Sequence, residues 1–236
     1  MVFLLREDPD LAERIPPDER ERATELLRVR VFTVPEGEWE PPRIDHGSIG
    51  LLLLTGLMVR KIYLGAHASA DLIGPGDIGR PWEDDLIPGL SPYLSEWIVL
   101  KEARVAHLDE RVTRAMGHWP ELGAMVAARF VRRSRSLAYL MAAHSFRRIE
   151  HRLLAALWHL GAIWGRVTPH GIRVPFRLTH EMLAEIVSAR RPSVSVAMGE
   201  LEREGLVSRD PNGCYLLHGD APDWRVSDPP VAEVEA

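Results

Sequence analysis

The stretch LAEIVSARRPSVSVAMGELEREGLV, residues 183–207, constrains the fold of this chain more than any other. Its apolar residues recur at three- and four-residue steps on both sides of a break made of small residues, which predicts two short helices. Thr179 suits the N-cap of the first helix, and Pro192 suits the first turn of the second, where its missing N–H would have no partner anyway. We therefore expect helices over residues 179–187 and 192–204.

The residues after the second helix predict a β-hairpin. Pro211-Asn212-Gly213 is a strong turn signal between two apolar segments, residues 206–208 and 214–217. Two short helices followed by a hairpin are the order of a winged helix-turn-helix.

In a helix-turn-helix the N-terminal part of the second helix enters the major groove of DNA. Arginine can make a bidentate bond to guanine there, and serine can bond to a phosphate or a base edge. The polar side of the second helix carries Arg191 and Ser195, opposite an apolar side that contains Val194, Ala197, Met198 and Leu201. The alternative to a DNA-contacting role is that the pair Arg190-Arg191 lies in a solvated turn and has no binding partner.

Charge is distributed unevenly along the 236 residues, whose formal net charge is −5. Residues 1–121 carry a net −8, residues 122–219 carry +7 from 14 basic and 7 acidic residues, and residues 220–236 carry −4. A basic region between acidic ones favours a polyanionic partner, although a basic surface with no partner remains the alternative.

The segment between residues 49 and 108 consists of short apolar stretches separated by glycine-rich turns. IGLLLLTGLMVRKIYLG predicts two strands broken at Thr55-Gly56, and EWIVLKEARVAHLD predicts a further strand pair. Short strands at short spacing predict a small all-β roll or barrel. Ahead of it, residues 18–28 predict a helix.

A single long helix is predicted over residues 119–146, which have no proline after Pro120 and one glycine. This helix is longer than is needed to cover one face of a small roll, so we expect its apolar side to be the seam of a homodimer. The expected seam residues are Leu122, Val126, Phe130, Leu137 and Met141. FRRIEHRLLAALWHLGAIWG predicts a second helix, residues 161–175 a linker, and the tail after Gly219 a disordered segment.

The segment LTHEMLAEIVSARRPSVSVAMGELEREGLVSRDPNGCYLLHG resembles the DNA-binding domain of the Crp/Fnr family, which includes the cyclic-AMP receptor protein. GSIGLLLLTG and LIGPGDIG resemble the strands and the PGD turn of that family's β-roll. The resemblance implies an α+β fold with an N-terminal double-stranded, cupin-like β-roll, a long dimerisation helix and a C-terminal winged helix-turn-helix. The corresponding ranges are 1–116, 117–146 and 147–219, followed by an acidic tail over 220–236.

Position by position, the resemblance assigns DNA-contacting roles in the C-terminal domain. It implies base contacts at Arg191, Pro192 and Val196, and Ser195 on the same face of the helix is a further base-contacting candidate. It implies phosphate contacts at Thr179, His180, Arg190 and Ser193, and Arg209 on the wing is a further phosphate-contacting candidate. The cyclic-AMP receptor protein has charged residues where this chain has Pro192 and Val196, so its operator is not carried over.

The part of the roll that binds cyclic AMP in the family departs from the family pattern. Family members that bind it carry Gly-Glu, a helix and then Arg-x-Ala. Here Arg80 stands in the place of the glutamate, Leu94 or Ser95 in that of the arginine, and Glu96 follows. Glu83, Asp84 and Asp85 add negative charge that repels a phosphate. We expect no cyclic-AMP binding in the usual mode, and Arg80 is the weak candidate for a relocated phosphate ligand.

These observations predict a homodimeric, sequence-specific transcription regulator that binds double-stranded DNA at a roughly palindromic site without cyclic AMP. RNA polymerase is a candidate partner, and the small-molecule effector is left open. Two alternatives are a regulator gated by a different ligand in the roll and a protein-binding adaptor that has lost DNA affinity.

Other functional classes find little support in the sequence. The single cysteine, Cys214, excludes an internal disulfide and a cysteine-ligated cluster, and we expect no metal and no cofactor. Without a nucleophile elbow, a P-loop or a zinc-binding helix motif we expect no enzyme. Without a leader or a long apolar run we expect a cytoplasmic protein that makes no use of a membrane.

Overall fold

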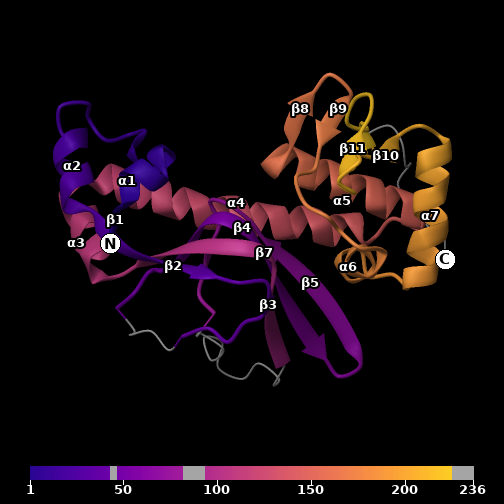
Figure 1. Ribbon diagram of the computed structural model, residues 1–236, viewed down its shortest axis with the longest axis horizontal. Coiled ribbons are helices and arrows are strands. Elements are labelled where there is room, and N and C mark those ends of the chain that lie inside the picture. Colours follow the sequence, from indigo (N-terminus) through magenta and orange to yellow (C-terminus); the bar gives the residue numbers. More distant parts are fainter. Residues whose placement is uncertain (43–46, 82–93, 225–236) are drawn as a thin grey trace, which may run out of the picture. The chain divides into compact units, whose positions relative to one another are not determined.

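The computed structural model describes residues 1–42, 47–81 and 94–224 (Figure 1). The chain divides into two compact units, Met1–Tyr139 and Leu140–Ala236. Both units combine helices with a sheet, which confirms the predicted α+β class. In the described part of the chain, no helix has both the length and the apolar character needed to cross a membrane.

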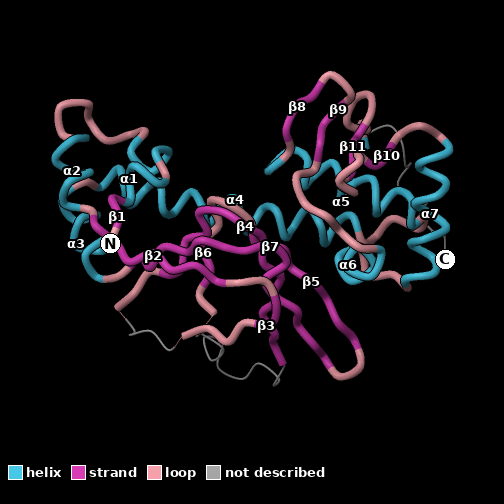
Figure 2. Tube along the Cα trace, viewed as in Figure 1, coloured by secondary structure: helices cyan, strands magenta, loops and turns pink. Residues whose placement is uncertain are grey.

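An antiparallel sheet forms the centre of the first unit (Figure 2). Its main strand order is β1-β2-β7-β4-β5, with β3 paired to β7 and β6 paired to β4. The strands are β1 (Val2–Phe3), β2 (Arg28–Val34), β3 (Gly37–Glu38), β4 (Gly50–Leu64), β5 (His67–Ile73), β6 (Ile78–Gly79) and β7 (Leu94–Leu108). Leu52 packs into one apolar cluster, and its neighbours Leu51 and Leu53 pack into another. Both sides of β4 are therefore buried, as the predicted roll requires.

The two longest strands differ from the sequence prediction. The expected break at Thr55-Gly56 is wrong, because β4 continues through it and pairs with β7 from Gly50 to Tyr63. The expected strand pair in EWIVLKEARVAHLD is likewise one strand, β7. Gly56 has φ +99° and lies within a series of register shifts, so it makes an irregularity in a continuous ladder and not a turn.

Helical segments complete the described part of the first unit, and the last of them continues to the first residues of the second. They are α1 (Leu4–Glu7), a 3-10 turn (Pro9–Ala12), α2 (Arg20–Leu26), α3 (Glu110–His118) and α4 (Pro120–Ala143). The helices predicted near residues 18–28 and over 119–146 are thus confirmed. On α4, Leu122 and Val126 are 0% and 4% exposed and belong to the core of this same unit. They have no surface left for a second copy, so the expected dimer seam needs correction at these two positions.

Arginines on the inner side of α4 hold this helix to the roll. The Arg129 guanidinium is 2.8 Å from a carboxylate oxygen of Asp8, and Arg133 forms an ion pair with Asp71. Arg132 donates to the carbonyl oxygen of Gly76 at 3.0 Å. Burial raises the pKa of Asp8 and outweighs the opposite effect of the Arg129 charge.

The second unit carries α5 (Ile149–Trp164), a small sheet and two short helices within its described residues. The sheet has the order β10-β11-β9-β8 and consists of β8 (Arg166–Thr168), β9 (Gly171–Arg173), β10 (Val207–Arg209) and β11 (Tyr215–Leu217). The hairpin predicted after the second short helix is therefore confirmed as β10–β11. The linker expected over residues 161–175 is wrong, because the end of α5 and the β8–β9 hairpin lie there. Strands of three residues are too short to give a recognisable periodicity.

The irregularity at Gly56 leads to a prediction about stability. A Cβ atom at this position would lie 2.4 Å from the carbonyl oxygen of Glu102, and the positive φ disfavours any L side chain. We expect Gly56→Ala to lower the free energy of unfolding by about 2 kcal/mol or more. Urea unfolding followed by circular dichroism measures this loss.

Gly117 provides the matched control. It lies in α3, and nothing is within 4 Å of a Cβ atom added there. Gly117→Ala should leave stability unchanged or raise it by up to about 1 kcal/mol. Equal losses in the two variants would show that Gly56 is not under the constraint described.

Candidate nucleic-acid interface

Two short helices of the second unit form the candidate interface, and local signals set their ends. The Thr179 hydroxyl accepts a hydrogen bond from the backbone N–H of Met182 at 3.2 Å and so caps α6 (His180–Ile186). Ser188, with φ +51°, lies in the turn before α7 (Arg191–Arg203). Both predicted helices are confirmed to within one residue at each end. The predicted apolar side of α7 is also confirmed, since Val194, Ala197, Met198 and Leu201 are all buried.

The outer side of α7 presents the four residues predicted to contact bases. Arg191, Pro192, Ser195 and Val196 are all exposed. Val196 is 65% exposed, although the opposite side of the same helix is closely packed. Contact between these residues and bases remains a prediction, and all four side chains are accessible to a partner.

The residues predicted to contact phosphates lie at the edges of that surface. Thr179, Arg190 and Arg209 are exposed, whereas His180 and Ser193 are half-buried. They occupy the start of α6, the start of α7 and the end of β10. Phosphate contact at these five positions is likewise still a prediction.

A chain of hydrogen bonds links α6, α7 and β10, and sequence reasoning missed it. The Arg209 guanidinium donates to Nε2 of His180 at 2.9 Å, and the other ring nitrogen, Nδ1, lies 2.9 Å from the Ser195 hydroxyl. The Ser195 hydroxyl in turn donates to the carbonyl oxygen of Arg191 at 3.1 Å. No spacing in the sequence points to this network, because its side chains come from three separate elements.

The network affects the charge of the surface. Burial, together with the positive charges of Arg209 and Arg191, holds the pKa of His180 below its ordinary value. Arg209 also donates to the Tyr215 hydroxyl at 2.6 Å, and burial raises the pKa of Tyr215 to about 12. His180 and Tyr215 are therefore both neutral near pH 7, and the positive charge of the surface comes from arginine.

The wing is fixed by its own ion pair. Arg173 on β9 pairs with Asp210, whose other carboxylate oxygen accepts from the backbone N–H of Cys214 at 2.8 Å. The Arg173 guanidinium holds the pKa of Asp210 below its usual value. Arg173 is thus committed to the turn of the hairpin, and Arg209 is the wing arginine that bonds to α6.

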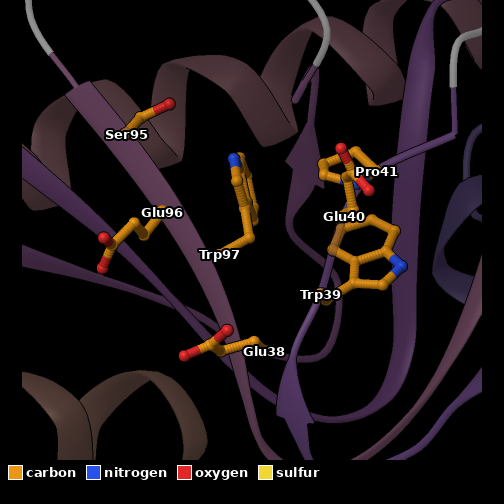
Figure 3. Close-up of a pocket in the computed structure, with 7 residues that line it drawn as sticks. All are labelled: Glu38, Trp39, Glu40, Pro41, Ser95, Glu96 and Trp97. Atoms are coloured by element: carbon orange, nitrogen blue, oxygen red, sulfur yellow. The ribbon is translucent and has the colours of Figure 1, made fainter.

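The roll of the first unit contains a shallow cavity of about 420 Å³ (Figure 3). A hydrogen bond of 2.8 Å from the backbone N–H of Trp39 to the carbonyl oxygen of Trp97 brings β7 and the end of β3 together. The two indole rings meet edge to face, with centroids 6.0 Å apart. Glu38, Glu40 and Glu96 also line the cavity, and none of its described lining residues is basic.

The structure describes two of the residues that the sequence places in the cyclic-AMP region, Arg80 and Glu96. Arg80 is half-buried directly after β6, and Glu96 accepts a hydrogen bond from the Tyr63 hydroxyl at 2.8 Å. Glu83, Asp84 and Asp85 lie outside the described residues. Within the described ranges, no three histidine, cysteine, aspartate or glutamate side chains are grouped so that they could hold a metal ion.

Comparisons with known proteins bear on both units. Residues 151–219 match the family model of the Crp-like helix-turn-helix domain. No curated protein sequence matches the chain. A CooA mutant from Carboxydothermus hydrogenoformans is 14% identical, with a TM-score of 0.62 over 92% of this chain and 91% of its own. The chain has a Crp/Fnr-type fold.

Two further structures share this Crp/Fnr-type fold. A cyclic nucleotide-binding domain containing protein from Listeria monocytogenes is 13% identical, with a TM-score of 0.67 over 89% of this chain and 96% of its own. A Crp-family transcriptional regulator from Thermus thermophilus is 23% identical, with a TM-score of 0.56 over 80% of this chain and 92% of its own. Identities this low establish the fold, while the Crp-like domain establishes which part of the chain carries the helix-turn-helix.

The exposed start of α7 leads to a prediction about specificity. We expect Arg191→Ala to weaken binding to a selected DNA site by roughly 1–3 kcal/mol and to relax the preference at one base pair. Arg190→Ala should weaken binding to all sequences similarly and reduce its salt dependence. Fluorescence anisotropy with selected and scrambled DNA measures both effects. Wild-type behaviour in both variants would contradict the assignment of α7 as the reading helix.

Proposed function

We propose that this chain is a sequence-specific, DNA-binding transcription regulator. The observation that carries the proposal is the exposed Arg190-Arg191 pair at the start of α7, within a Crp-like helix-turn-helix domain. Arginine at the N-terminal end of such a helix can reach guanine in the major groove, and neighbouring cations bind the phosphates. Residues 140–219 of the second unit contain 10 arginines and 7 acidic residues, and this net +3 favours the electrostatic attraction that DNA binding requires.

Selection of bound sequences from random DNA with the purified chain tests this proposal. We expect enrichment of one motif, and an affinity whose logarithm falls linearly with the logarithm of salt concentration. An adaptor that has lost DNA affinity would enrich nothing and show no salt-dependent shift.

The proposed regulator acts as a homodimer that pairs through the outer side of α4. The exposed positions there follow at three- and four-residue steps: Ala127, Val131, Ser134, Ala138 and Met141. Val131 and Met141 are 49% and 72% exposed. Small residues between large apolar ones suit close helix–helix packing. Of the residues predicted from the sequence, the proposed seam keeps Met141 and the neighbouring Phe130 and Leu137. It omits Leu122 and Val126, which are buried in the core.

A dimer of this kind predicts the form of the DNA site. A two-fold axis relating two reading helices requires two inverted half-sites whose centres are about one helical turn apart. The selected motif should therefore be roughly palindromic. A motif without inverted repeats would argue against the dimer and leave DNA binding itself intact.

Val131→Asp tests the seam. Val131 is exposed in the single chain, so the change should leave folding intact while it places a charge in the helix–helix contact. We expect light scattering at micromolar concentration to change from the mass of two chains to that of one. Thr113→Asp adds the same charge at an exposed position of α3 and should leave the mass at two chains. A dimer that persists in Val131→Asp would exclude this seam.

The proposed regulator also binds DNA without cyclic AMP. Two features support this part of the proposal: the arginines of α4 already hold the helix to the roll, and Glu38, Glu40 and Glu96 line the cavity of the roll. Carboxylates repel a phosphate, and a helix that is already anchored needs no ligand to fix it. The cavity favours the second candidate function, a regulator gated by a ligand other than a phosphate ester.

Calorimetry with millimolar cyclic AMP tests whether DNA binding is independent of this nucleotide. We expect no saturable heat and no change in DNA affinity when the nucleotide is added. Arg80→Ala should behave as wild type in this titration. Saturable binding at one site per chain that tightens DNA binding and is lost in Arg80→Ala would identify Arg80 as a relocated phosphate ligand.

A further inference from the structure

The hydrogen bonds around His180 define which of its nitrogens carries the proton. A guanidinium N–H can only donate, so Nε2 of His180 accepts from Arg209 and carries no hydrogen. The hydrogen of the neutral ring is then on Nδ1, which donates to the Ser195 hydroxyl. The Ser195 hydroxyl in turn donates its hydrogen bond to the carbonyl oxygen of Arg191. Each hydrogen bond from Arg209 to Arg191 thus has one donor and one acceptor, and the arrangement is complete only while the ring is neutral.

Protonation of His180 would break this arrangement at one defined point. A hydrogen on Nε2 would face the Arg209 guanidinium at 2.9 Å. Glu202, whose carboxylate is 3.9 Å from Arg209, is one negative charge and cannot compensate two adjacent cations. The Nδ1 bond to Ser195 would persist, because that nitrogen is already the donor. Arg209 would therefore be the group that moves, while the side chain of Ser195 on α7 would keep its position.

The charged surroundings of His180 favour the neutral ring in the free protein. Arg209 on β10 and Arg191 on α7 oppose a positive charge on it, and Glu202 on α7 favours one. His180 is also the first residue of α6, and the helix dipole disfavours a positive charge at that end of a helix. A further titratable group bonded to Arg209, the Tyr215 hydroxyl on β11, stays neutral because its pKa is about 12. DNA would reverse this balance, because its phosphates favour cations at the edge of the surface.

From this geometry we infer that DNA binding takes up a proton at His180 and releases Arg209 from the histidine toward the DNA backbone. The inference rests on the proposed function and assigns His180 as a positioning residue whose protonation adds one phosphate-binding group. Since binding raises the pKa of the ring, linkage requires DNA affinity to rise as the pH falls through that range. A rise of one pKa unit on binding corresponds to about tenfold tighter binding at a pH below both values.

Glutamine at position 180 separates this effect from other titrations. Its side-chain carbonyl can accept from Arg209 as the neutral ring does, and it never becomes charged. His170→Gln, in the exposed turn between β8 and β9, is the matched control. Between pH 7.5 and 5.5 we expect wild type and His170→Gln to gain several-fold in DNA affinity, and His180→Gln to gain less than about twofold. Over the same range, the slope of log affinity against log salt should steepen by about one in wild type and not in His180→Gln.

Nuclear magnetic resonance of the His180 ring adds a readout on the free protein. The ring should titrate below an ordinary histidine without DNA and at a higher pH in the complex. An ordinary or raised pKa in the free protein would overturn the inference, and so would an equal pH response in wild type and His180→Gln. In the latter case DNA binding itself would stand. Failure of every variant to bind DNA at any pH would instead overturn the proposed function, and this inference with it.

Discussion

The charged contacts between α4 and the roll determine how the long helix can be used. Arg129, Arg132 and Arg133 turn toward the roll and form ion pairs with Asp8, Asp77 and Asp71 there. Buried or half-buried ion pairs of this kind add little net stability, but removing one partner is costly because the other charge is left without compensation. They therefore fix which side of α4 faces inward. With that side committed, the opposite side of α4 is the part available to another chain.

This commitment also explains why two residues of the predicted seam had to be withdrawn. A helix with apolar residues on two sides shows one broad stripe in a periodicity analysis. Leu122 and Val126 belong to the inner side near the start of α4, whereas Phe130, Val131 and Met141 are exposed farther along. Three arginines at the centre of the helix look like a solvated face in the sequence. Only the positions of their carboxylate partners, far away in the chain, show that this face is the inner one.

The predictions that held were those that rest on local chemistry. The cap at Thr179, the early proline in α7 and the Pro-Asn-Gly turn each define a structure within a few residues, and all three lie where expected. The break expected at Gly56 failed because a glycine in a turn and a glycine in an irregular strand look alike until the partner strand is known. The His180 network could not be predicted, since it needs the packing of α6, α7 and β10 on one another. Local signals thus established the elements of the candidate interface, and tertiary contacts established how its side chains are held.

The basic residues between positions 122 and 219 have a common identity with a regulatory consequence. All 14 basic residues within 122–219 are arginines, and the two lysines of the chain, Lys61 and Lys101, lie on β4 and β7 of the roll. Acetylation neutralises lysine but leaves arginine charged. Lysine acylation therefore has no target on the proposed DNA-binding surface. The permanent charge of that surface cannot be switched off by enzymes that modify lysine, and any such modification of a lysine side chain in this protein would fall on its sheet.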